Sequence, residues 1–317
     1  MIIFIVGGAG YIGSHMAKLA TKSNFQVIVL DNLSTGHEDA VSYGKFEFCD
    51  ILDSKRLNQL FVEYQPDAVM HFGAFSLVEE SINDPYKYYH NNVAGTLSLL
   101  RAMIDNNCLK FIFSSTAAVY GSPQYIPIDE SHPTNPINPY GKSKLMVEQI
   151  LSDFKAAYGL NYISFRYFNA AGHDREGELS ERHDPETHLL PIIMQALNGQ
   201  RESVVIFGND YDTKDGTCVR DYIHVEDIAS AHLKGLEYLQ NENCSSTEFN
   251  LGNGTGFSVQ EVINITKSLS RKEFKVDISE RRPGDPSTLV ASGIKSKKEL
   301  KVHLEFPNLE DIIKTLL

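Results

Sequence analysis

A tyrosine and a lysine in this chain have the spacing of an acid–base pair. The segment YGKSK contains Tyr140 and Lys144, and the segment SSTAAVYG places Thr116 upstream of them. If Tyr140 opens a helix, Lys144 follows one turn later on the same face, where its ammonium group can stabilise a phenolate and lower the tyrosine pKa. A phenol that titrates at about 10 could then act as a base at neutral pH. A surface helix with an unrelated Tyr and Lys is the commoner origin of this spacing, so the surrounding sequence has to decide.

A glycine-rich turn, GGAGYIG, follows the apolar run from Ile2 to Val6 and precedes an amphipathic stretch. In that context Gly7, Gly10 and Gly13 can make a tight turn, let backbone amides approach a pyrophosphate, and let a helix pack closely on a strand. The amino terminus of the helix then offers unpaired donors and a partial positive charge to phosphates. The pattern predicts a dinucleotide site.

The identity of the dinucleotide depends on Asp31, at the end of the next apolar run, QVIVLD. A carboxylate there can accept hydrogen bonds from both ribose hydroxyls. The segment NLST that follows has no Arg or Lys to neutralise a 2′-phosphate, which favours NAD over NADP. For an isolated Asp at the end of a strand, capping of a turn would be the commoner interpretation. The place of Asp31 in a βαβ unit instead favours a ribose-binding role. Asp50, after the third strand, could accept a hydrogen bond from an adenine amino group.

Composition and charge argue against several classes of function. The chain has 317 residues, enough for about two domains or one large one. Its 29 basic and 41 acidic residues give a formal charge of −12, which argues against nucleic-acid and membrane partners. Four cysteines without CxxC spacing and a first apolar run too short for a signal segment fit the cytoplasm best. We interpret His183 and His188, in HDPETH, as loop residues and expect no metal.

The elements that must position these residues indicate a Rossmann-type α/β fold. Short apolar strands alternate with helical segments, as a parallel sheet requires. A long helix is predicted from Asp84, with Pro85 first and with Val93, Leu97 and Leu100 at helical spacing. Another helix is predicted from Tyr140 to Tyr158, closed by Gly159, before the strand YISFRYF. We expect an NAD-binding Rossmann domain over 1–168 and a second, smaller α/β domain over 169–317, with a return to the main sheet near 219–250.

The motifs together resemble the extended short-chain dehydrogenase/reductase family and, within it, the UDP-glucose 4-epimerases. The resemblance lies in HFGAFSLVEES, YYHNNVAGT, SSTAAVYG, PYGKSKLMVEQIL, RYFNAAG, IFGNDYDTKDGTCVRDYIHVEDIA and RRPGD, in order along nearly the whole chain. It implies an isomerase with tightly bound NAD that interconverts UDP-glucose and UDP-galactose by transient oxidation at C4. It also implies a UDP-sugar-binding role for the second domain and a homodimer formed through the helices near 85–104 and 140–158.

The resemblance also implies roles for single residues. Tyr140 matches the catalytic tyrosine, Lys144 its partner, and Thr116 the residue that hydrogen-bonds the sugar 4-hydroxyl. The positions that match the NAD site are Gly7, Gly10, Tyr11, Ile12, Gly13, Asp31, Asn32, Asp50, Ile51, Phe72, Asn91 or Asn92, Tyr140, Lys144 and Tyr167. The positions that match the nucleotide-sugar site are Thr116, Asn169, Leu189, Phe207, Arg220, Tyr222, Arg282, Asp285 and Leu289.

Two of these positions make direct physical sense. The guanidiniums of Arg220 and Arg282 could hold a diphosphate with a fork geometry that lysine does not reproduce. Ordinary ion pairs to Asp221 or Asp285 are the alternative interpretation, and the sequence leaves both open.

Other enzyme classes, and several positions where this chain differs from many family members, bear on the predicted activity. Nucleotide-sugar 4,6-dehydratases share the cofactor and the Tyr–Lys pair, but they carry acidic residues where this chain has Ala117 and Ala118, which cannot transfer protons. A catalytically inactive binding protein would be expected to lose Tyr or Lys, and a dehydrogenase that releases NADH would need added NAD. Ser76 replaces a lysine found near the nicotinamide in many members, and the tail lacks their tryptophan-rich final helix. Leu289, where tyrosine excludes N-acetylated sugars and small residues admit them, predicts some activity on UDP-N-acetylhexosamines.

Overall fold

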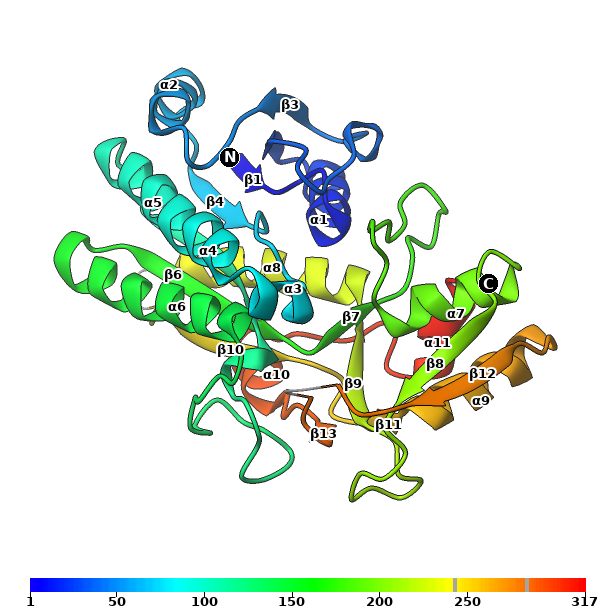
Figure 1. Ribbon diagram of the computed structural model, residues 1–317. Helices are drawn as coiled ribbons and strands as arrows, with labels where there is room; N and C mark the ends of the chain where they lie inside the picture. Colours follow the sequence, from blue (N-terminus) through cyan, green and yellow to red (C-terminus); the bar gives the residue numbers. More distant parts are fainter. Residues whose placement is uncertain (242–243, 283–284) are drawn as a thin grey trace.

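A parallel sheet of seven strands dominates the computed structural model, which describes residues 1–241, 244–282 and 285–317 (Figure 1). Every neighbouring pair in it is parallel. The strand order changes direction between β1 and β4, and ligands of such sheets bind beyond the carboxyl ends of the strands at this point. The predicted Rossmann-type fold is confirmed. In spatial order the strands are β10 (Thr247–Leu251), β6 (Asn161–Tyr167), β5 (Lys110–Thr116), β4 (Ala68–His71), β1 (Ile2–Val6), β2 (Gln26–Asp31) and β3 (Lys45–Phe48).

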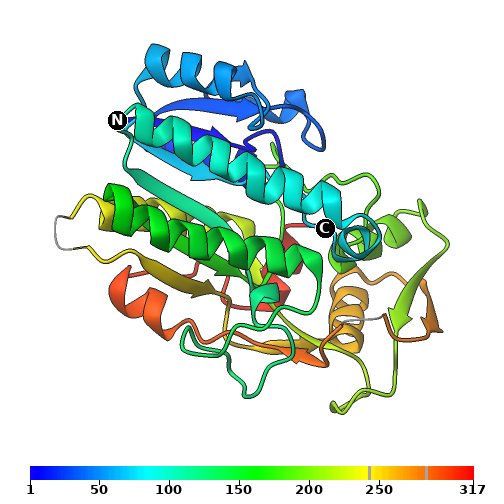
Figure 2. The same cartoon turned by 60° about the vertical axis from the view of Figure 1, so that its left-hand side comes forward.

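Helices cover both faces of this sheet (Figures 1 and 2). Because successive side chains of a strand point to opposite faces, Ile3 and Ile5 belong to one core and Phe4 and Val6 to another. Strands buried on both faces explain why the sequence shows continuous apolar runs. The first core contains side chains of α1 (Tyr11–Lys22) and α8 (Val225–Leu239), and the second contains side chains of α2 (Ser54–Tyr64), α5 (Thr96–Asp105) and α6 (Pro139–Tyr158).

The helix predicted from Asp84 is interrupted. Asp84 caps α4 (Pro85–Tyr88), with Pro85 at the first turn, and a π-helical segment (Tyr89–Gly95) joins α4 to α5. A π-turn holds more residues than an α-turn, so the face of the helix shifts along the sequence. Leu97 is therefore exposed, whereas Leu99 and Leu100 are buried. The prediction of one long helix with Val93, Leu97 and Leu100 at regular helical spacing is therefore wrong at the π-helical segment.

The rest of the chain builds a smaller α/β part. A four-stranded sheet is centred on β9 (Val219–His224), which pairs with β7 (Asn169–Ala171), β11 (Gly256–Ser258) and β13 (Thr288–Leu289). A second, two-stranded sheet joins β8 (Ser203–Phe207) to β12 (Lys275–Ser279). Side chains of α7 (Leu189–Leu197), α9 (Val259–Ser270) and α11 (Leu309–Lys314) form the core here. The remaining helices are α3 (Val78–Asn83) and α10 (Ile294–Glu299).

The chain crosses between the two parts more than once. After β9, helix α8 packs on α1 against the large sheet, and β10 becomes an edge strand of that sheet beside β6. In the described ranges, no helix combines the length and the apolar composition that a bilayer crossing requires.

Candidate active site

The glycine turn lies at the carboxyl end of β1, where the strand order changes. Gly7 has a φ of +79°, and a Cβ at this position would meet the backbone nitrogen of Gly73 at 2.4 Å. A Cβ at Gly13 would meet the carbonyl oxygen of Gly7 at 2.2 Å. Gly10 is the N-cap of α1. Because glycine has no side chain to form a capping hydrogen bond, the first backbone N–H groups of the helix stay available for a ligand. This backbone fits the pyrophosphate of a dinucleotide.

Asp31 connects this turn to the end of β2. Its Oδ2 accepts a hydrogen bond from the backbone N–H of Ala9 at 2.9 Å, and its Oδ1 accepts one from Leu33 at 2.8 Å. Burial raises the pKa of Asp31, and these backbone N–H groups act in the opposite direction. A carboxylate has about four acceptor positions, so two remain for a ribose. Asp31 therefore caps the turn and can also hold a ribose.

The other residues predicted at the adenosine end converge at the ends of β2 and β3. Asn32 donates a hydrogen bond from Nδ2 to Oδ2 of Asp50 at 2.9 Å. Ile51 is buried and lies against Gly95, where a Cβ would meet its side chain at 2.6 Å. Ile12 packs against the core below the turn. These side chains can form the wall of an adenine site.

Thr116, Tyr140 and Lys144 converge beyond the carboxyl end of β5. Asn138 caps α6 by accepting a hydrogen bond from the N–H of Gly141 at 2.8 Å, and this fixes Tyr140 in the first turn. Thr116 ends β5, and its side chain is hydrogen-bonded to Tyr140. The Nζ of Lys144 lies 6.0 Å from the centroid of the Tyr140 ring. The predicted helix and the predicted convergence of these residues are both present.

The electrostatics of this group differ from the expectation. Burial raises the pKa of Tyr140, and the hydrogen bond with Thr116 lowers it only in part. Burial also lowers the pKa of Lys144 to about 7, while Glu148 on the next turn raises it. Lys144 donates to the carbonyl of Ser114 at 2.8 Å instead of to the phenol. The expected lowering of the Tyr140 pKa by Lys144 is therefore wrong for this structure, because desolvation dominates at both groups.

The side chains predicted at the nicotinamide end surround a histidine that sequence reasoning missed. The hydroxyl of Tyr167 lies 2.6 Å from Nε2 of His232, and the ring of Phe72 lies 4.9 Å from the ring of His232. Burial of His232 lowers its pKa to about 4, so it stays neutral at pH 7. His232 lies four residues after Ile228, whose carbonyl its Nδ1 contacts. This spacing on the apolar face of the helix was the sequence signal that could have placed it in the core.

Of the two asparagines predicted at the nicotinamide end of the NAD site, Asn92 has the clearer structural role. Its side chain is buried, accepts from the N–H of Phe75 at 3.0 Å, and donates to Ser143 at 3.2 Å. Asn91 donates to Asn92 at 3.0 Å. The pair thereby joins the loop after β4 to the helix that bears Tyr140.

A buried ion pair supports the same strand and helix, and the sequence analysis did not identify it. Glu148 on α6 accepts from Arg166 on β6 at 3.0 and 2.6 Å, and Ser115 donates to Glu148 at 2.5 Å. Arg166 also donates to the hydroxyl of Tyr120 at 2.9 Å. Breaking such a pair leaves an uncompensated buried charge, so it holds β5, β6 and α6 in one arrangement.

The two arginines predicted at the diphosphate have different surroundings. Arg220 on β9 pairs with Asp285 at 3.0 Å, which agrees with one of the two ion pairs considered from the sequence. Asp221 is instead buried and accepts three backbone N–H groups. The guanidinium of Arg282 lies 3.8 Å from the centroid of the Phe207 ring, and no described carboxylate lies within ion-pair distance of it.

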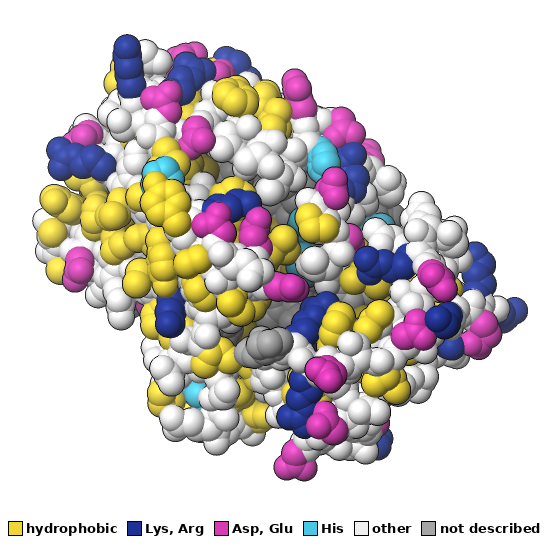
Figure 3. Space-filling model, in the orientation of Figure 1, with side chains coloured by type: hydrophobic (Ala, Val, Ile, Leu, Met, Phe, Trp, Pro, Cys, Tyr) yellow, Lys and Arg dark blue, Asp and Glu magenta, His cyan; other side chains and the backbone are white. Residues whose placement is uncertain are grey.

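The remaining predicted residues flank this group. Asn169 on β7 pairs with Tyr222 on β9, and Leu289 on β13 pairs with Arg220. Leu289 packs against the cluster that contains Ala117 from the turn after β5, whereas Leu189 packs into the core of the smaller part. Figure 3 shows this face of the molecule hollowed near its middle, with charged side chains gathered around the hollow.

The turn after Thr116 bears on the choice between two chemistries. Ala117 and Ala118 follow Thr116 in a single 3₁₀ turn, in which Ala118 N–H donates to the Thr116 hydroxyl at 3.1 Å. Neither alanine side chain can transfer a proton. The turn therefore lacks the acid and base that an elimination of water requires at this point.

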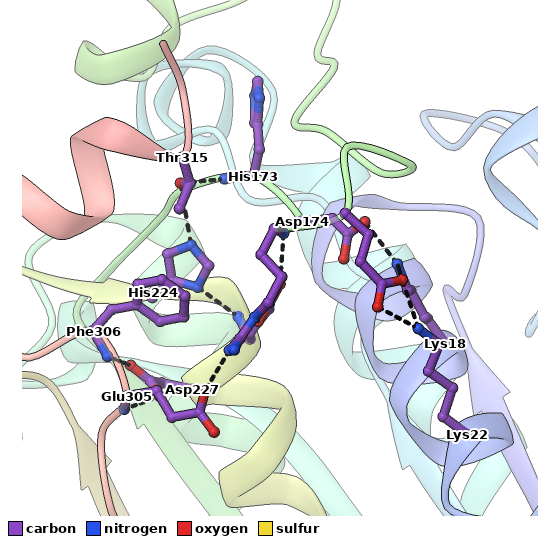
Figure 4. Close-up of polar contacts among 12 residues, drawn as sticks. Lys18, Lys22, His173, Asp174, His224, Asp227, Glu305, Phe306 and Thr315 are labelled. Atoms are coloured by element: carbon purple, nitrogen blue, oxygen red, sulfur yellow. Dashed lines mark hydrogen bonds and ion pairs between the residues drawn. The ribbon is translucent and has the colours of Figure 1, made fainter.

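The loop that follows β7 is fixed against the glycine-turn helix. The hydroxyl of Tyr11 donates to the carbonyl of Gly172 at 2.5 Å, and burial raises the pKa of Tyr11. Lys18 on the same helix forms an ion pair with Asp174 at 2.7 Å, and both side chains are buried (Figure 4).

The carboxyl-terminal segment closes the other side of this loop (Figure 4). The hydroxyl of Thr315 accepts from the N–H of His173 at 3.0 Å and lies 3.2 Å from Nε2 of His224. Asp227 accepts the backbone N–H groups of residues 305 and 306 at 2.8 and 3.1 Å. The short tail thus contributes directly to the frame of the site.

Comparison with known proteins shows the family to which this chain belongs. The sequence model described as "NAD dependent epimerase/dehydratase family" matches residues 3–252. The chain belongs to this family. A UDP-glucose 4-epimerase of Halalkalibacterium halodurans is 49% identical to it over 313 residues, 99% of this chain and 93% of the relative. This confirms the resemblance expected from the sequence motifs.

Solved structures of family members superpose closely. The crystal structure of UDP-glucose 4-epimerase from Brucella ovis in complex with NAD has a TM-score of 0.96 and 47% identity, covering 99% of this chain and 96% of that chain. A UDP-Glc/GlcNAc 4-epimerase from Campylobacter jejuni has a TM-score of 0.86 and 44% identity, covering 99% and 97%.

Proposed function

We propose that this family member interconverts UDP-glucose and UDP-galactose by transient oxidation at C4 with tightly bound NAD. The observation that carries the proposal is the convergence of Thr116, Tyr140 and Lys144 beyond the same sheet edge that presents the glycine turn and Asp31. The names of the similar proteins support the same substrate pair.

Bound NAD would supply the hydride acceptor, and the chain would manage the proton. Tyr140 would act as the phenolate and take the proton of the 4-hydroxyl at its phenol oxygen, and Thr116 would orient that hydroxyl. Lys144, whose pKa of about 7 lies near neutrality, can hold or pass a proton at Nζ. Reversal of these transfers on the other face of the sugar gives the inverted alcohol without net oxidation.

Inversion also requires the sugar to turn while the nucleotide stays bound. Affinity must then come from the nucleotide and diphosphate and not from the hexose. Arg220 on β9 and Arg282 beside Phe207 are the residues to which we assign the diphosphate. We assign NAD binding to residues 1–168 with the return near 219–250, and UDP-sugar binding to residues 169–317.

A homodimer would form through the helices near 85–104 and 140–158. Tyr86 on α4, Leu97 on α5 and Met146 on α6 are exposed. Figure 3 shows hydrophobic side chains gathered over these helices. All four cysteines are free thiols, which supports a reducing compartment such as the cytoplasm.

The assay that tests the proposal uses untreated protein and no added NAD. Incubation with UDP-galactose is expected to yield UDP-glucose, and Tyr140→Phe is expected to lose at least ~100-fold in turnover because its proton acceptor is absent. Tyr125→Phe, at an exposed tyrosine outside the proposed interface and site, serves as the matched control. A 4-keto-6-deoxy product would establish the dehydratase, and steady release of NADH with added NAD, without UDP-glucose formation, would establish a dehydrogenase.

The same assay resolves substrate breadth. Leu289 is half-buried beside Ala117, and leucine is smaller than tyrosine. We expect slower but measurable conversion of UDP-GalNAc to UDP-GlcNAc, and loss of that conversion alone in Leu289→Tyr. No conversion by the wild-type protein would contradict the assignment of Leu289.

A further inference from the structure

A cluster of two histidines and two glutamates lies in the loop before α7, outside the residues assigned to catalysis. It consists of Glu181, His183, Glu186 and His188, whose ligand atoms all lie within 4.8 Å of one another. The sequence analysis placed His183 and His188 in a loop and expected no metal there. In the structure, Glu181 and Glu186 of the same loop lie beside the two histidines.

The four histidine–glutamate distances are close to the edge lengths of a metal tetrahedron. The Nδ1 of His183 lies 3.2 Å from Glu181 and 3.5 Å from Glu186. The Nδ1 of His188 lies 3.1 Å from Glu181 and 3.0 Å from Glu186. Zinc–ligand bonds of about 2.0–2.1 Å in a tetrahedron place neighbouring ligand atoms about 3.3–3.4 Å apart. The two Glu186 distances involve different oxygens, Oε2 for His183 and Oε1 for His188, and the ligand atoms of all four residues lie within 4.8 Å of one another.

Hydrogen bonding within the cluster leaves one donor unexplained. The Nδ1 atom of His183 is buried and makes no hydrogen bond of acceptable geometry, although two carboxylates lie beside it. The Glu181 and Glu186 side chains are only 3% and 5% exposed. Two adjacent buried carboxylates need a compensating positive charge. A cation between all four groups would satisfy both requirements.

A neighbouring acidic group shows what a filled cluster looks like. Asp174, Glu176 and Glu178 also converge, but the ammonium group of Lys18 lies 2.7, 2.8 and 2.9 Å from them. No lysine or arginine of the described residues forms an ion pair with Glu181 or Glu186, whose ion-pair partners are the two histidines.

We propose that Glu181, His183, Glu186 and His188 bind one divalent transition-metal ion of the zinc class in a closed, four-ligand structural site. Imidazole nitrogen and carboxylate oxygen are ligands that Zn²⁺ accepts in tetrahedral geometry, and four protein ligands leave no open position for catalysis. The ring of His183 lies 6.4 Å from the ring of Tyr11, edge to face. The ion would thereby fix the loop between β7 and α7 against the glycine turn.

The test measures metal binding directly. Untagged protein is stripped with a chelator and titrated with Zn²⁺ in a calorimeter, and the melting temperature is recorded with and without the metal. We expect one equivalent to bind and the melting temperature to rise. Co²⁺ in the same site is expected to give the intense visible absorption of tetrahedral coordination.

Variants assign the binding to these residues. His183→Asn with His188→Asn is expected to weaken Zn²⁺ binding by more than about 100-fold, beyond the loss seen for groups that only orient ligands. His303→Asn, at an exposed histidine elsewhere, is the control. Glu186→Gln, which keeps the size of the side chain, gives the same answer if the double variant does not fold.

Two results would overturn the proposal. If the wild-type protein takes up no Zn²⁺ and its melting temperature does not change, the cluster is a pair of imidazolium–carboxylate ion pairs. If the variants bind Zn²⁺ as tightly as the wild-type protein, the ion binds elsewhere. Neither result depends on epimerase activity, so the proposed function is tested separately.

Discussion

At the scale of single residues, burial controls the reactive groups more than their mutual charges do. The spacing of Tyr140 and Lys144 correctly predicted their common helix, but not the direction of the Tyr140 pKa shift. Periodicity reports which residues share a face, whereas desolvation depends on everything packed around that face. The same limit hid His232 and the Glu148–Arg166 pair, which chain folding brings together from distant segments.

Lys144 offers a test through pH. Its pKa is lowered to about 7, so the unfolded protein binds more protons than the folded protein between about pH 7 and 10.5. Below pH 7, burial of the charged Lys144 lowers the free energy of unfolding by its full amount. This loss disappears as the pH rises from about 7 to 10.5. Glu148 opposes the shift, and Lys144 in turn lowers the pKa of His71.

We therefore expect the difference in unfolding free energy between Lys144→Met and the wild-type protein to depend on pH. The advantage of the variant should fall by about 1 kcal/mol per pH unit from pH 7 to pH 9. Urea unfolding of nucleotide-free protein measures this, with the exposed Lys155→Met as control. A difference that is constant with pH would mean that Lys144 is not desolvated.

Arg282 offers a test of the diphosphate site. It stacks on Phe207 and has no ion-pair partner among the described carboxylates, so its charge is available to a ligand. Arg282→Ala is expected to weaken UDP-glucose binding by about 2–5 kcal/mol. Arg281→Ala is the matched control, because the adjacent Arg281 pairs with Asp210. Calorimetric titration that gives equal affinities for the two variants would exclude Arg282 from the site.

At the scale of elements, the sequence predicted most strands and helices and missed changes of register. The strands at 2–6 and 26–31 and the helix ending before Gly159 lie where apolar runs and caps placed them. The π-helical segment carries no composition signal, and the hydrogen bond that Asn92 accepts within it comes from Phe75, which is remote in sequence. The role of the final helix was also hidden, because α11 is short and its partners are remote in sequence.

The carboxyl-terminal helix is expected to stabilise the whole smaller part. Ile312 is fully buried in its core, so Ile312→Ala should lower the free energy of unfolding by about 2–5 kcal/mol. Leu317→Ala, at a residue that is 57% exposed, should change it by less than about 0.5 kcal/mol. Equal effects of the two substitutions in denaturant unfolding would show that α11 is not an integral part of the fold.

At the scale of the whole molecule, the proposed site combines parts that no local pattern relates. The large sheet supplies the glycine turn, Asp31 and the Tyr140 group, and the smaller part supplies Arg220 and Arg282. The sequence predicted these residues one by one through motifs and resemblance. It did not show that the loop after β7, the start of α8 and the tail meet around Asp174, Asp227 and Thr315 (Figure 4).

The central claim is that one bound NAD takes the hydrogen from C4 of the sugar and returns the same hydrogen to the opposite face of C4 after the sugar has rotated in the site. The most direct measurement follows UDP-galactose deuterated at C4 as it is converted to UDP-glucose in ordinary water, with unlabelled NAD added. We expect deuterium to stay at C4 of the product, as read by mass spectrometry and NMR. Loss of the label to water or to the added NAD would contradict it.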